Sequence, residues 1–353
     1  MKLFTVGPTQ MHERTLEVSG RQVPYFRNQE FSDVVFDCER LFRECAKADA
    51  DARLVILTAS GTGAMEAVVM NYLGKDDRAL VVNGGSFGAR FAQICDIHGV
   101  PHSDIVLEPD EQLEQHHLDA HREDGCTALL VNLDETSTGQ LYDLDMLAAF
   151  AKENGLFFVV DAISAFASDP INFQEAGIDA LIVSSQKALA IAPGIALVLL
   201  SGRAVERLEG APRTTLYFDF NDYLLNGVRG QTPFTPAVGI IYELQDRLHA
   251  IKEAGGIDVE VERVTAQASD FRERISDLPL SVAPFRKSNA VTRIVFEKPI
   301  AKTVCAKLKA DYGFVLNPCG GAMADTALRV AHIGDLTIED NKALAEALKV
   351  LVG

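Results

Sequence analysis

The 353-residue sequence predicts an α/β fold with two domains. The larger would hold a mixed, mostly parallel sheet flanked by helices, and the smaller would be an α+β domain at the C-terminal end. Three observations indicate this. The chain is longer than one hydrophobic core usually supports. Short apolar runs alternate with helical stretches over the first 240 residues, which is typical of a mostly parallel sheet. Beyond residue 257, few strands remain between longer helices.

The strands of the large sheet are predicted from short apolar runs bounded by polar or small residues. These runs are residues 53–59, 79–83, 127–132, 156–161, 180–185 and 195–201. The amphipathic stretches between them, predicted as helices, are residues 64–73, 87–98, 143–154 and 171–176. About ten residues that include Pro193-Gly194 join the last two strands, which is too short for a helical crossover. These two strands should therefore form an antiparallel hairpin.

The C-terminal part of the chain differs in composition and in its pattern of apolar residues. Residues 204–236 are rich in aromatic and polar side chains and are predicted as loop, with an extended segment between Pro233 and Pro236. A long helix over 237–254 should end at Gly255-Gly256. Further helices are expected near 258–276, 300–312 and 337–351, with strands near 290–296 and 327–332. We expect an N-terminal arm, a large cofactor-binding domain and a small domain, over residues 1–18, 19–240 and 241–353.

Charge and composition narrow the range of partners. The formal net charge is −17, which argues against nucleic acids and anionic membrane surfaces. The six cysteines contain no C-x-x-C pair, which favours reduced thiols over a disulfide framework or a zinc site. No apolar run reaches 18 residues, and the N-terminus lacks an apolar signal region. We expect a soluble, cytoplasmic protein without a bound metal.

Lys187 and Asp161 each stand at the end of a predicted apolar strand. A lysine where an apolar strand meets a loop is poorly solvated, which lowers its pKa and keeps part of it as the nucleophilic amine. An aspartate on a neighbouring strand could hold a protonated ring nitrogen. A pyridoxal phosphate (PLP) enzyme needs both, the lysine for a Schiff base and the carboxylate for the pyridinium. The pair alone is equally compatible with two ordinary polar residues at strand ends.

The run Ser60-Gly61-Thr62-Gly63 follows a predicted strand and opens a helix. Small residues let the backbone approach an anion, which the free N–H groups and the helix dipole would bind. The run does not complete a dinucleotide fingerprint, because Glu66 occupies the third glycine position, and it lacks the Gly-Lys-Ser/Thr ending of a P-loop. It is either a phosphate site or a tight strand–helix turn.

Two further segments offer ring contacts. Phe87 lies at the glycine-rich end of the strand that closes at Asn83, and could stack on a pyridine ring or be a core side chain at a helix start. The hydroxyls of Glu-Thr-Ser-Thr-Gly at 135–139 could reach a ring oxygen, or could belong to a polar turn with an N-cap.

Together these features resemble the class V branch of the fold-type I PLP aminotransferases. Within this branch, the features are most similar to the alanine/serine–glyoxylate (or pyruvate) and the 2-aminoethylphosphonate–pyruvate transaminases. The resemblance spans almost the whole chain and rests on seven motifs in order. They are Val-Gly-Pro-Thr (6–9), Ser-Gly-Thr-Gly-Ala-Met-Glu-Ala (60–67), Glu-Thr-Ser-Thr-Gly (135–139), Val-Asp-Ala (160–162), Ser-Gln-Lys-Ala-Leu (185–189), Thr-Pro-Ala-Val (235–238) and Leu-Arg-Val (328–330).

The resemblance implies roles for residues that touch the ring and the substrate. Lys187 would form the Schiff base and then shuttle a proton, and Asp161 would keep the pyridine nitrogen protonated. Phe87 would stack on the ring, and Thr136 would bond near the ring oxygen. Arg329 would hold the α-carboxylate of the substrate through a two-pronged salt bridge, a geometry suited to guanidinium.

The resemblance also implies a phosphate site and a shared dimer. Ser60, Gly61 and Thr62 would bind the phosphate, with Gln186 beside the lysine. Thr235 would reach in from the other subunit, so the protein would be a homodimer with active sites at the subunit interface.

The sequence departs from the family pattern in places. Many relatives carry a His-Arg pair after the N-terminal arm, whereas this chain has Phe26 and Arg27, which leaves the role of Arg27 open. Cysteine desulfurases of this fold place histidines where Phe87 and Gln186 stand here. Cys319, in a glycine-rich loop, could be a thiol nucleophile or a plain loop thiol.

We therefore expect a transaminase with a ping-pong cycle that moves the amino group of a small donor, such as alanine or serine, to pyruvate or glyoxylate. The nearest alternative is 2-aminoethylphosphonate–pyruvate transamination. PLP-dependent lyase or desulfurase chemistry at Cys319 comes next. A non-enzymatic nucleotide-binding module is disfavoured by Glu66 at the third glycine position and by a lysine that such a module would not need.

Overall fold

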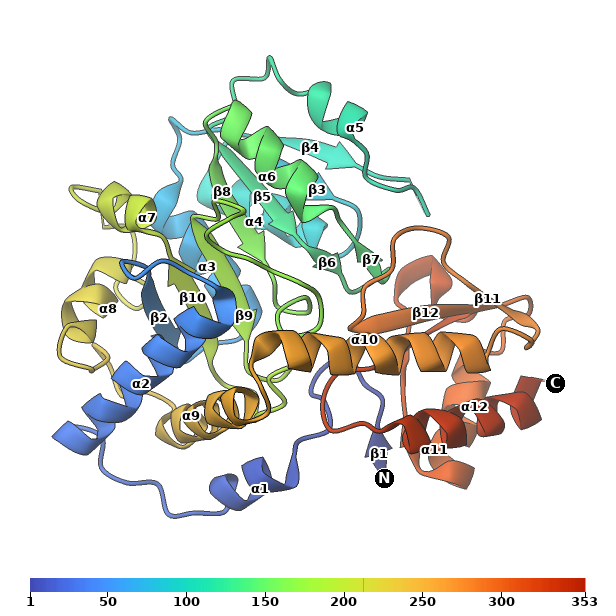
Figure 1. The fold of residues 1–353 in the computed structure, drawn as a ribbon. Coiled ribbons are helices and arrows are strands. Elements are labelled where there is room, and N and C mark those ends of the chain that lie inside the picture. Colours follow the sequence, from blue (N-terminus) through green and yellow to red (C-terminus); the bar gives the residue numbers. More distant parts are fainter. Residues whose placement is uncertain (109, 212, 353) are drawn as a thin grey trace.

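The computed structural model describes residues 1–108, 110–211 and 213–352 (Figure 1). Within these residues the strands form a seven-stranded sheet, a four-stranded sheet and two small two-stranded sheets. The seven-stranded sheet uses strands between residues 53 and 200, and the four-stranded sheet uses strands after residue 279. Figure 1 shows the two larger sheets as separate layers, with α10 (Ile257–Arg274) running beside the smaller one.

The large sheet is mixed and mostly parallel, as the sequence predicts. All neighbouring strands run parallel except the pairs that include β10, which is antiparallel to both β2 and β9. The predicted antiparallel hairpin is thus confirmed. The strands, in spatial order, are β2 (Arg53–Leu57), β10 (Ala196–Leu200), β9 (Ala180–Ser184), β8 (Phe157–Asp161), β5 (Ala128–Asn132), β3 (Ala79–Asn83) and β4 (His102–Val106).

Helices cover both faces of this sheet, which explains why its central strands are apolar throughout. Leu129 and Val131 belong to one core with side chains from α2 (Gln29–Ala46) and α9 (Val238–Glu253). Leu130, between them, belongs to a second core on the other face. That core also contains side chains from α3 (Gly61–Tyr72), α4 (Gly88–His98) and α8 (Phe220–Gly227), while α6 (Leu144–Glu153) joins the first.

The four-stranded sheet is antiparallel and has its own apolar core, which includes Phe271, Leu308 and Leu344. Its order is β11 (Leu280–Val282), β12 (Val291–Phe296), β15 (Ala327–Ala331) and β14 (Asn317–Pro318). The helices α10, α11 (Ala301–Tyr312) and α12 (Ile338–Val352) supply the rest of this core. The N-terminal β1 (Lys2–Leu3) pairs in parallel with β13 (Phe314–Val315), so the first residues of the chain lie against the C-terminal part. The division into an arm and two domains at residues 18/19 and 240/241 stays a prediction.

Two sequence-based predictions were wrong. Residues 171–176 form turns and no helix. The N–H of Phe173 donates to Ala46 O of α2, and the Asn172 side chain accepts from Glu175 N, so local backbone groups are satisfied outside a helix. Residues 204–236 are also more than loop, because α8 begins where the Asp219 side chain accepts the N–H of Asn221.

The remaining elements are short. They are α1 (Glu13–Ser19), α5 (Gln115–Asp119), α7 (Gly202–Arg207), β6 (Asp134–Glu135), β7 (Gln140–Leu141) and a 3-10 turn at Gly321–Met323.

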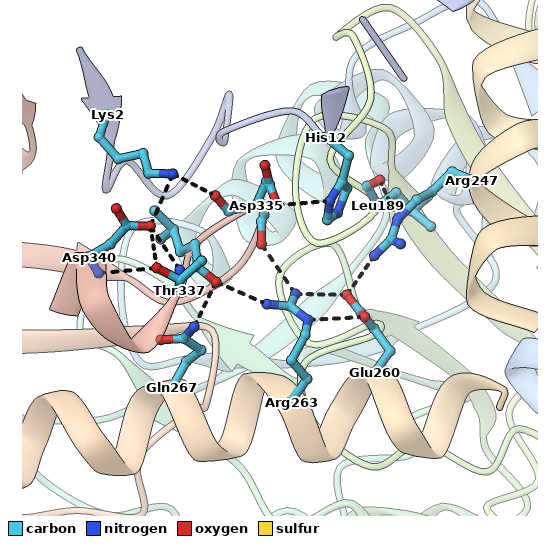
Figure 2. A network of polar contacts seen from close by, with 12 residues as sticks. Lys2, His12, Leu189, Arg247, Glu260, Arg263, Gln267, Asp335, Thr337 and Asp340 are labelled. Atoms are coloured by element: carbon cyan, nitrogen blue, oxygen red, sulfur yellow. Dashed lines mark hydrogen bonds and ion pairs between the residues drawn. The ribbon is translucent and has the colours of Figure 1, made fainter. Parts of the chain in front are cut away.

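A buried ionic network joins α9, α10 and the loop after β9 (Figure 2). The guanidinium of Arg247 donates to Glu260 Oε1 at 2.6 Å and, through Nε, to Leu189 O at 3.2 Å. Arg263 donates to the same carboxylate at 2.9 Å and to Gly334 O at 3.2 Å. Further along, Lys2 pairs with Asp340 at 3.0 Å. The network ties both ends of the chain to the loop that carries Lys187.

Candidate active site

The predicted lysine and aspartate meet at the carboxyl edge of the large sheet. Asp161 is the last residue of β8, and Lys187 lies three residues beyond the end of β9. In sheets of this kind, ligands bind outside the carboxyl ends of the strands. Both side chains line one small cavity there, whose walls are Phe87, Asp134, Thr136, Asp161, Ile163, Ser164 and Lys187.

Lys187 is only 9% exposed. Burial lowers the pKa of its amine to about 8, against the opposing pull of the Asp134 and Asp161 carboxyls. The chain's own N-terminal segment covers it, because a Cβ added to Gly7 would lie 3.1 Å from Lys187 Nζ. Gly7 has φ +145°, and Thr9 Oγ1 donates to Lys187 O at 2.9 Å. The amine is thus held neutral in part and shielded from bulk water.

Asp161 is buried and oriented by two donors. Its Oδ2 accepts from Asn132 Nδ2 at 2.6 Å, and its Oδ1 accepts from Ile163 N at 2.8 Å. Burial raises the pKa of this carboxyl to about 6, although both hydrogen bonds oppose the shift. A carboxylate in such a place would be stabilised strongly by a cationic N–H partner.

Phe87 and Thr136 both lie in the cavity wall, and Glu135 holds the backbone at Phe87. The buried Glu135 carboxylate accepts from Phe87 N at 3.1 Å and from Gly88 N at 3.0 Å. It thereby caps α4 and joins the turn after β5 to the turn after β3. Thr136 Oγ1 lies 2.6 Å from Ser164 Oγ, so its hydroxyl is already hydrogen-bonded within the cavity wall.

The glycine-containing run opens α3 beside this cavity. Ser60 is the N-cap of α3, and its Oγ accepts from Gly63 N at 3.4 Å. A Cβ on Gly61 would come within 2.3 Å of the cavity-lining Ile163, so a larger residue there would have to displace the Ile163 side chain. The Thr62 hydroxyl accepts from Arg90 Nη1 at 3.0 Å, which places a cation at this helix N-terminus. Gln186, beside the lysine, accepts from Ser184 Oγ at 2.7 Å.

Thr235 is not part of the cavity lining in its own chain. It is exposed and lies in a separate surface groove together with Tyr25 and Phe26. Arg27 braces the segment that leads to it, because its Nη1 donates to Thr232 O at 2.7 Å and its Nη2 to Pro233 O at 3.2 Å. Within one chain, Arg27 therefore holds this segment in place.

Arg329 extends from β15 to the wall of the cavity. Its Nη1 donates to Thr136 O at 3.3 Å, while its buried Nε has no hydrogen-bond partner among the described residues. Cys319 is only 5% exposed and does not line the cavity. Burial raises the pKa of its thiol, which keeps it protonated.

Sequence reasoning missed a buried acid in the cavity, Asp134. The Ser288 hydroxyl lies 2.8 Å from Asp134 Oδ2 and 2.9 Å from Asp169 Oδ2, and it accepts from Ala290 N. The Ser288 hydroxyl therefore bridges the two buried carboxyls. Asp169 also accepts from Asn289 N, whereas Asp134 Oδ1 has no partner among the described residues.

Asp134 has fewer hydrogen-bond donors than the buried Asp169. Burial and the nearby Asp169 raise its pKa well above the usual range. The only feature of the sequence that could have indicated Asp134 is its position directly before the Glu-Thr-Ser-Thr-Gly run, since Ser288 and Asp169 are remote in the chain.

Comparison with known proteins agrees with this geometry. The family model for aminotransferase class-V matches residues 15–322. A 2-aminoethylphosphonate–pyruvate transaminase of Burkholderia pseudomallei is 30% identical over 318 residues, which cover 88% of this chain and 85% of that protein. A protein of Synechococcus sp. named "Soluble hydrogenase, small subunit" is 29% identical over 99% of this chain and 92% of its own.

Among solved structures, an aspartate aminotransferase of subgroup IV from Thermus thermophilus has a TM-score of 0.92 at 25% identity. The alignment covers 100% of this chain and 99% of that one. No described group of three or more His, Cys, Asp or Glu side chains could hold a metal ion, and no described helix is long and apolar enough to span a membrane.

Proposed function

The chain belongs to the class-V aminotransferase family and is a PLP-dependent enzyme, and from this premise we propose that it transfers the amino group of a small donor to pyruvate or glyoxylate. The observation that carries the proposal is the pairing of a partly neutral, buried Lys187 with a buried Asp161 in one cavity. Alanine or serine are the proposed donors. The relative from Burkholderia pseudomallei supports 2-aminoethylphosphonate as the alternative donor.

The residues of the cavity fit PLP. Its walls offer an aromatic side chain, an amine and a carboxylate, which are the groups that bind and tune this cofactor. Asp134 Oδ1 and Arg329 Nε are buried polar atoms without a described partner, as expected where a polar ligand binds. Bound PLP would supply an electron sink that stabilises the carbanion left when a substrate carbon loses its proton.

Lys187 is the proposed base and acid of the reaction. With a pKa of about 8, its amine can take up a proton and return it near neutral pH. The Gly7 backbone over the amine limits access of bulk water and so protects the transferred proton. Asp161 would hold a protonated ring nitrogen, since burial makes an unpaired carboxylate there unfavourable.

Phosphate binding is proposed at the start of α3. The backbone N–H groups of Gly61 and Thr62, with the Ser60 hydroxyl, would hold the phosphate at the helix N-terminus. Arg90 adds a positive charge beside Thr62, and Gln186 lies next to the lysine. Phe87 would stack on the ring, and Thr136 would bond near its oxygen.

We propose that the last phosphate contact, Thr235, comes from the partner subunit of a homodimer. Its exposure and its absence from the cavity lining of its own chain support this. Thr235→Ala should weaken PLP retention by about 1.5–3 kcal/mol, the value of a hydrogen bond to a charged group, without altering the fold. The exposed Thr214, whose hydroxyl donates to Met70 O at 2.8 Å, is the matched control. An active monomer in sedimentation would refute the shared site.

Arg329 is proposed to bind the α-carboxylate, from its place beside Thr136 and its unpaired Nε. Thiol chemistry at Cys319 is less favoured, because the thiol is buried outside the cavity lining. The test is a screen of alanine, serine, cysteine and 2-aminoethylphosphonate against pyruvate and glyoxylate, with separate half-reactions followed by absorbance. Amino-group transfer with two separable half-reactions supports the ping-pong proposal. Sulfide release from cysteine that disappears in Cys319→Ser would favour the desulfurase alternative.

A further inference from the structure

A second arginine lies beside Arg329 on the four-stranded sheet. Arg293 on β12 and Arg329 on β15 are directly paired in the antiparallel register. Side chains of directly opposed residues point to the same face of a sheet, and their Cα atoms are about 4.5–5.5 Å apart. Both guanidiniums also lower the pKa of Cys319, against the larger effect of burial. The two cations therefore occupy one face, and Arg329 reaches the wall of the Lys187 cavity from it.

Arg293 is buried with an incomplete set of partners. It is 2% exposed, and its guanidinium lies 5.3 Å from the centre of the Phe285 ring. Nη2 forms an ion pair with Asp110, whose side chain is 47% exposed, and Nη1 contacts the sulfur of Met323 at 3.4 Å. Its Nε has no hydrogen-bond partner among the described residues, and neither has Nε of Arg329.

The contrast with Arg247 shows what is missing. Arg247 is similarly buried, but it donates to the buried carboxylate of Glu260 and to a backbone carbonyl, both within the protein core. Arg293 has only a half-exposed carboxylate on a loop. A buried guanidinium beside a second one is costly unless anions neutralise both. Two guanidinium forks on one face suit a ligand with two acidic groups, since each fork can bind a carboxylate, phosphonate or phosphate.

We propose that Arg293 is a specificity-determining residue that binds a distal acidic group of the amino donor, a carboxylate or phosphonate away from the reacting carbon. This inference rests on the proposed function and adds donors with a distal acidic group to the proposed alanine and serine. In this arrangement Asp110 occupies the anion position of Arg293 when no substrate is bound, and a substrate with a distal acid displaces it. Donors without such a group, such as alanine, leave Arg293 paired with Asp110.

The kinetic test compares donors in two variants. In Arg293→Met, which keeps the apolar stem against Phe285, kcat/KM for aspartate should fall about 10- to 100-fold, the loss of one charge-assisted contact. The value for alanine should stay nearly unchanged, with glyoxylate as the acceptor throughout. Asp110→Asn removes the competing carboxylate and should increase kcat/KM for aspartate only. Equal losses for all donors in Arg293→Met would show a purely structural arginine and overturn the proposal.

A binding measurement separates this proposal from the proposed reaction. Succinate and propionate are titrated into the holoenzyme by calorimetry, because neither can react. Succinate should bind more tightly to the wild type, and Arg293→Met should remove that advantage while it leaves propionate unaffected. Equal binding of both acids to the wild type contradicts the distal-acid site, whether or not any donor is transaminated. If the wild type binds succinate more tightly than propionate but catalyses no transamination, only the proposed function is refuted.

Discussion

Two clusters of buried charge involve the loop that carries Lys187, and they are built in opposite ways. In one, Arg247 and Glu260 are each at most 7% exposed and are paired at 2.6 Å, with Arg263 and Leu189 O completing their hydrogen bonds (Figure 2). In the other, Lys187 and Asp161 are as deeply buried, yet Lys187 forms no ion pair with any described residue and Asp161 is held by amide donors alone.

We propose that the difference separates a structural site from a reactive one. Pairing keeps the first cluster charged, and hydrogen bonds and nearby arginines lower the pKa of Glu260 in spite of burial. In the second cluster the effect of burial is larger than that of the neighbouring groups. It lowers the pKa of Lys187 to about 8 and raises that of Asp161 to about 6, so both move closer to pH 7. Groups held near neutrality can exchange protons with a ligand, and they lower the stability of the empty site. Each prediction below tests one side of this contrast.

The largest expected effect is on the reactive lysine. Lys187→Ala should reduce transamination by about 10⁴-fold or more, because both the covalent attachment and the proton transfer depend on this amine. Circular dichroism should show an unchanged fold. The control is Lys287→Ala, since burial also lowers the pKa of Lys287, but its Nζ donates only to the nearby Phe285 O. Equal loss of activity in both variants would contradict the assignment.

Asp161→Asn removes the charge of the second cavity residue with little change of shape. Turnover should fall about 10²- to 10⁴-fold, the scale of losing one preorganised electrostatic partner at a reacting group. Single-turnover kinetics of each half-reaction measure it. Unchanged turnover would mean that Asp161 only orients Asn132 and the turn after β8.

A substitution in the paired cluster of Arg247 and Glu260 should change the stability of the fold. Arg247→Met leaves Glu260 buried with Arg263 alone, and we expect a loss of about 3–5 kcal/mol in the free energy of unfolding. Denaturant unfolding measures it, and kcat of the folded protein should stay close to that of the wild type. The double variant Arg247→Met/Glu260→Met should recover part of the stability, because it removes the unpaired carboxylate. A large loss of kcat with unchanged stability would reverse the roles of the two clusters.

In the cofactor-free protein, removing the charge of Lys187 should raise the free energy of unfolding, whereas removing that of Arg247 should lower it. The folded-state pKa falls from 10.5 to about 8, so between these values the unfolded chain binds more protons than the folded one. The free energy of unfolding therefore rises with pH across that window. Below it, Lys187→Met should be more stable than the wild type by about 2–3 kcal/mol, and the difference should shrink as pH rises toward 10.5. A destabilised variant at pH 7 would contradict a strained lysine.

The sequence predicted most of the large sheet and the two residues, Lys187 and Asp161, that meet in the candidate cavity, because both depend on local patterns. Buried strands are marked by apolar runs, and Lys187 and Asp161 are marked by standing at the ends of such runs. The turns at 171–176 were mistaken for a helix, because an amphipathic pattern does not show that Phe173 N bonds to Ala46 O across the core.

Residues that depend on tertiary contacts could not be predicted. Arg90 faces Thr62 only because α3 and α4 pack together, and Asp134 has its hydrogen bond only because Ser288 comes from a segment 154 residues away. Arg293 stands beside Arg329 only through the register of β12 and β15. The local sequence does not indicate any of these contacts, whereas it does indicate where the strands end.

We propose that the chemistry takes place at Lys187, the unpaired lysine of the reactive cluster. Borohydride reduction of the purified holoenzyme, followed by proteolysis and mass spectrometry, would locate the covalently fixed cofactor. We expect a pyridoxyl group on the peptide that contains Lys187 and on no other lysine. A pyridoxyl group on a different lysine in the folded enzyme, with Lys187 unmodified, would show that the reaction depends on another residue.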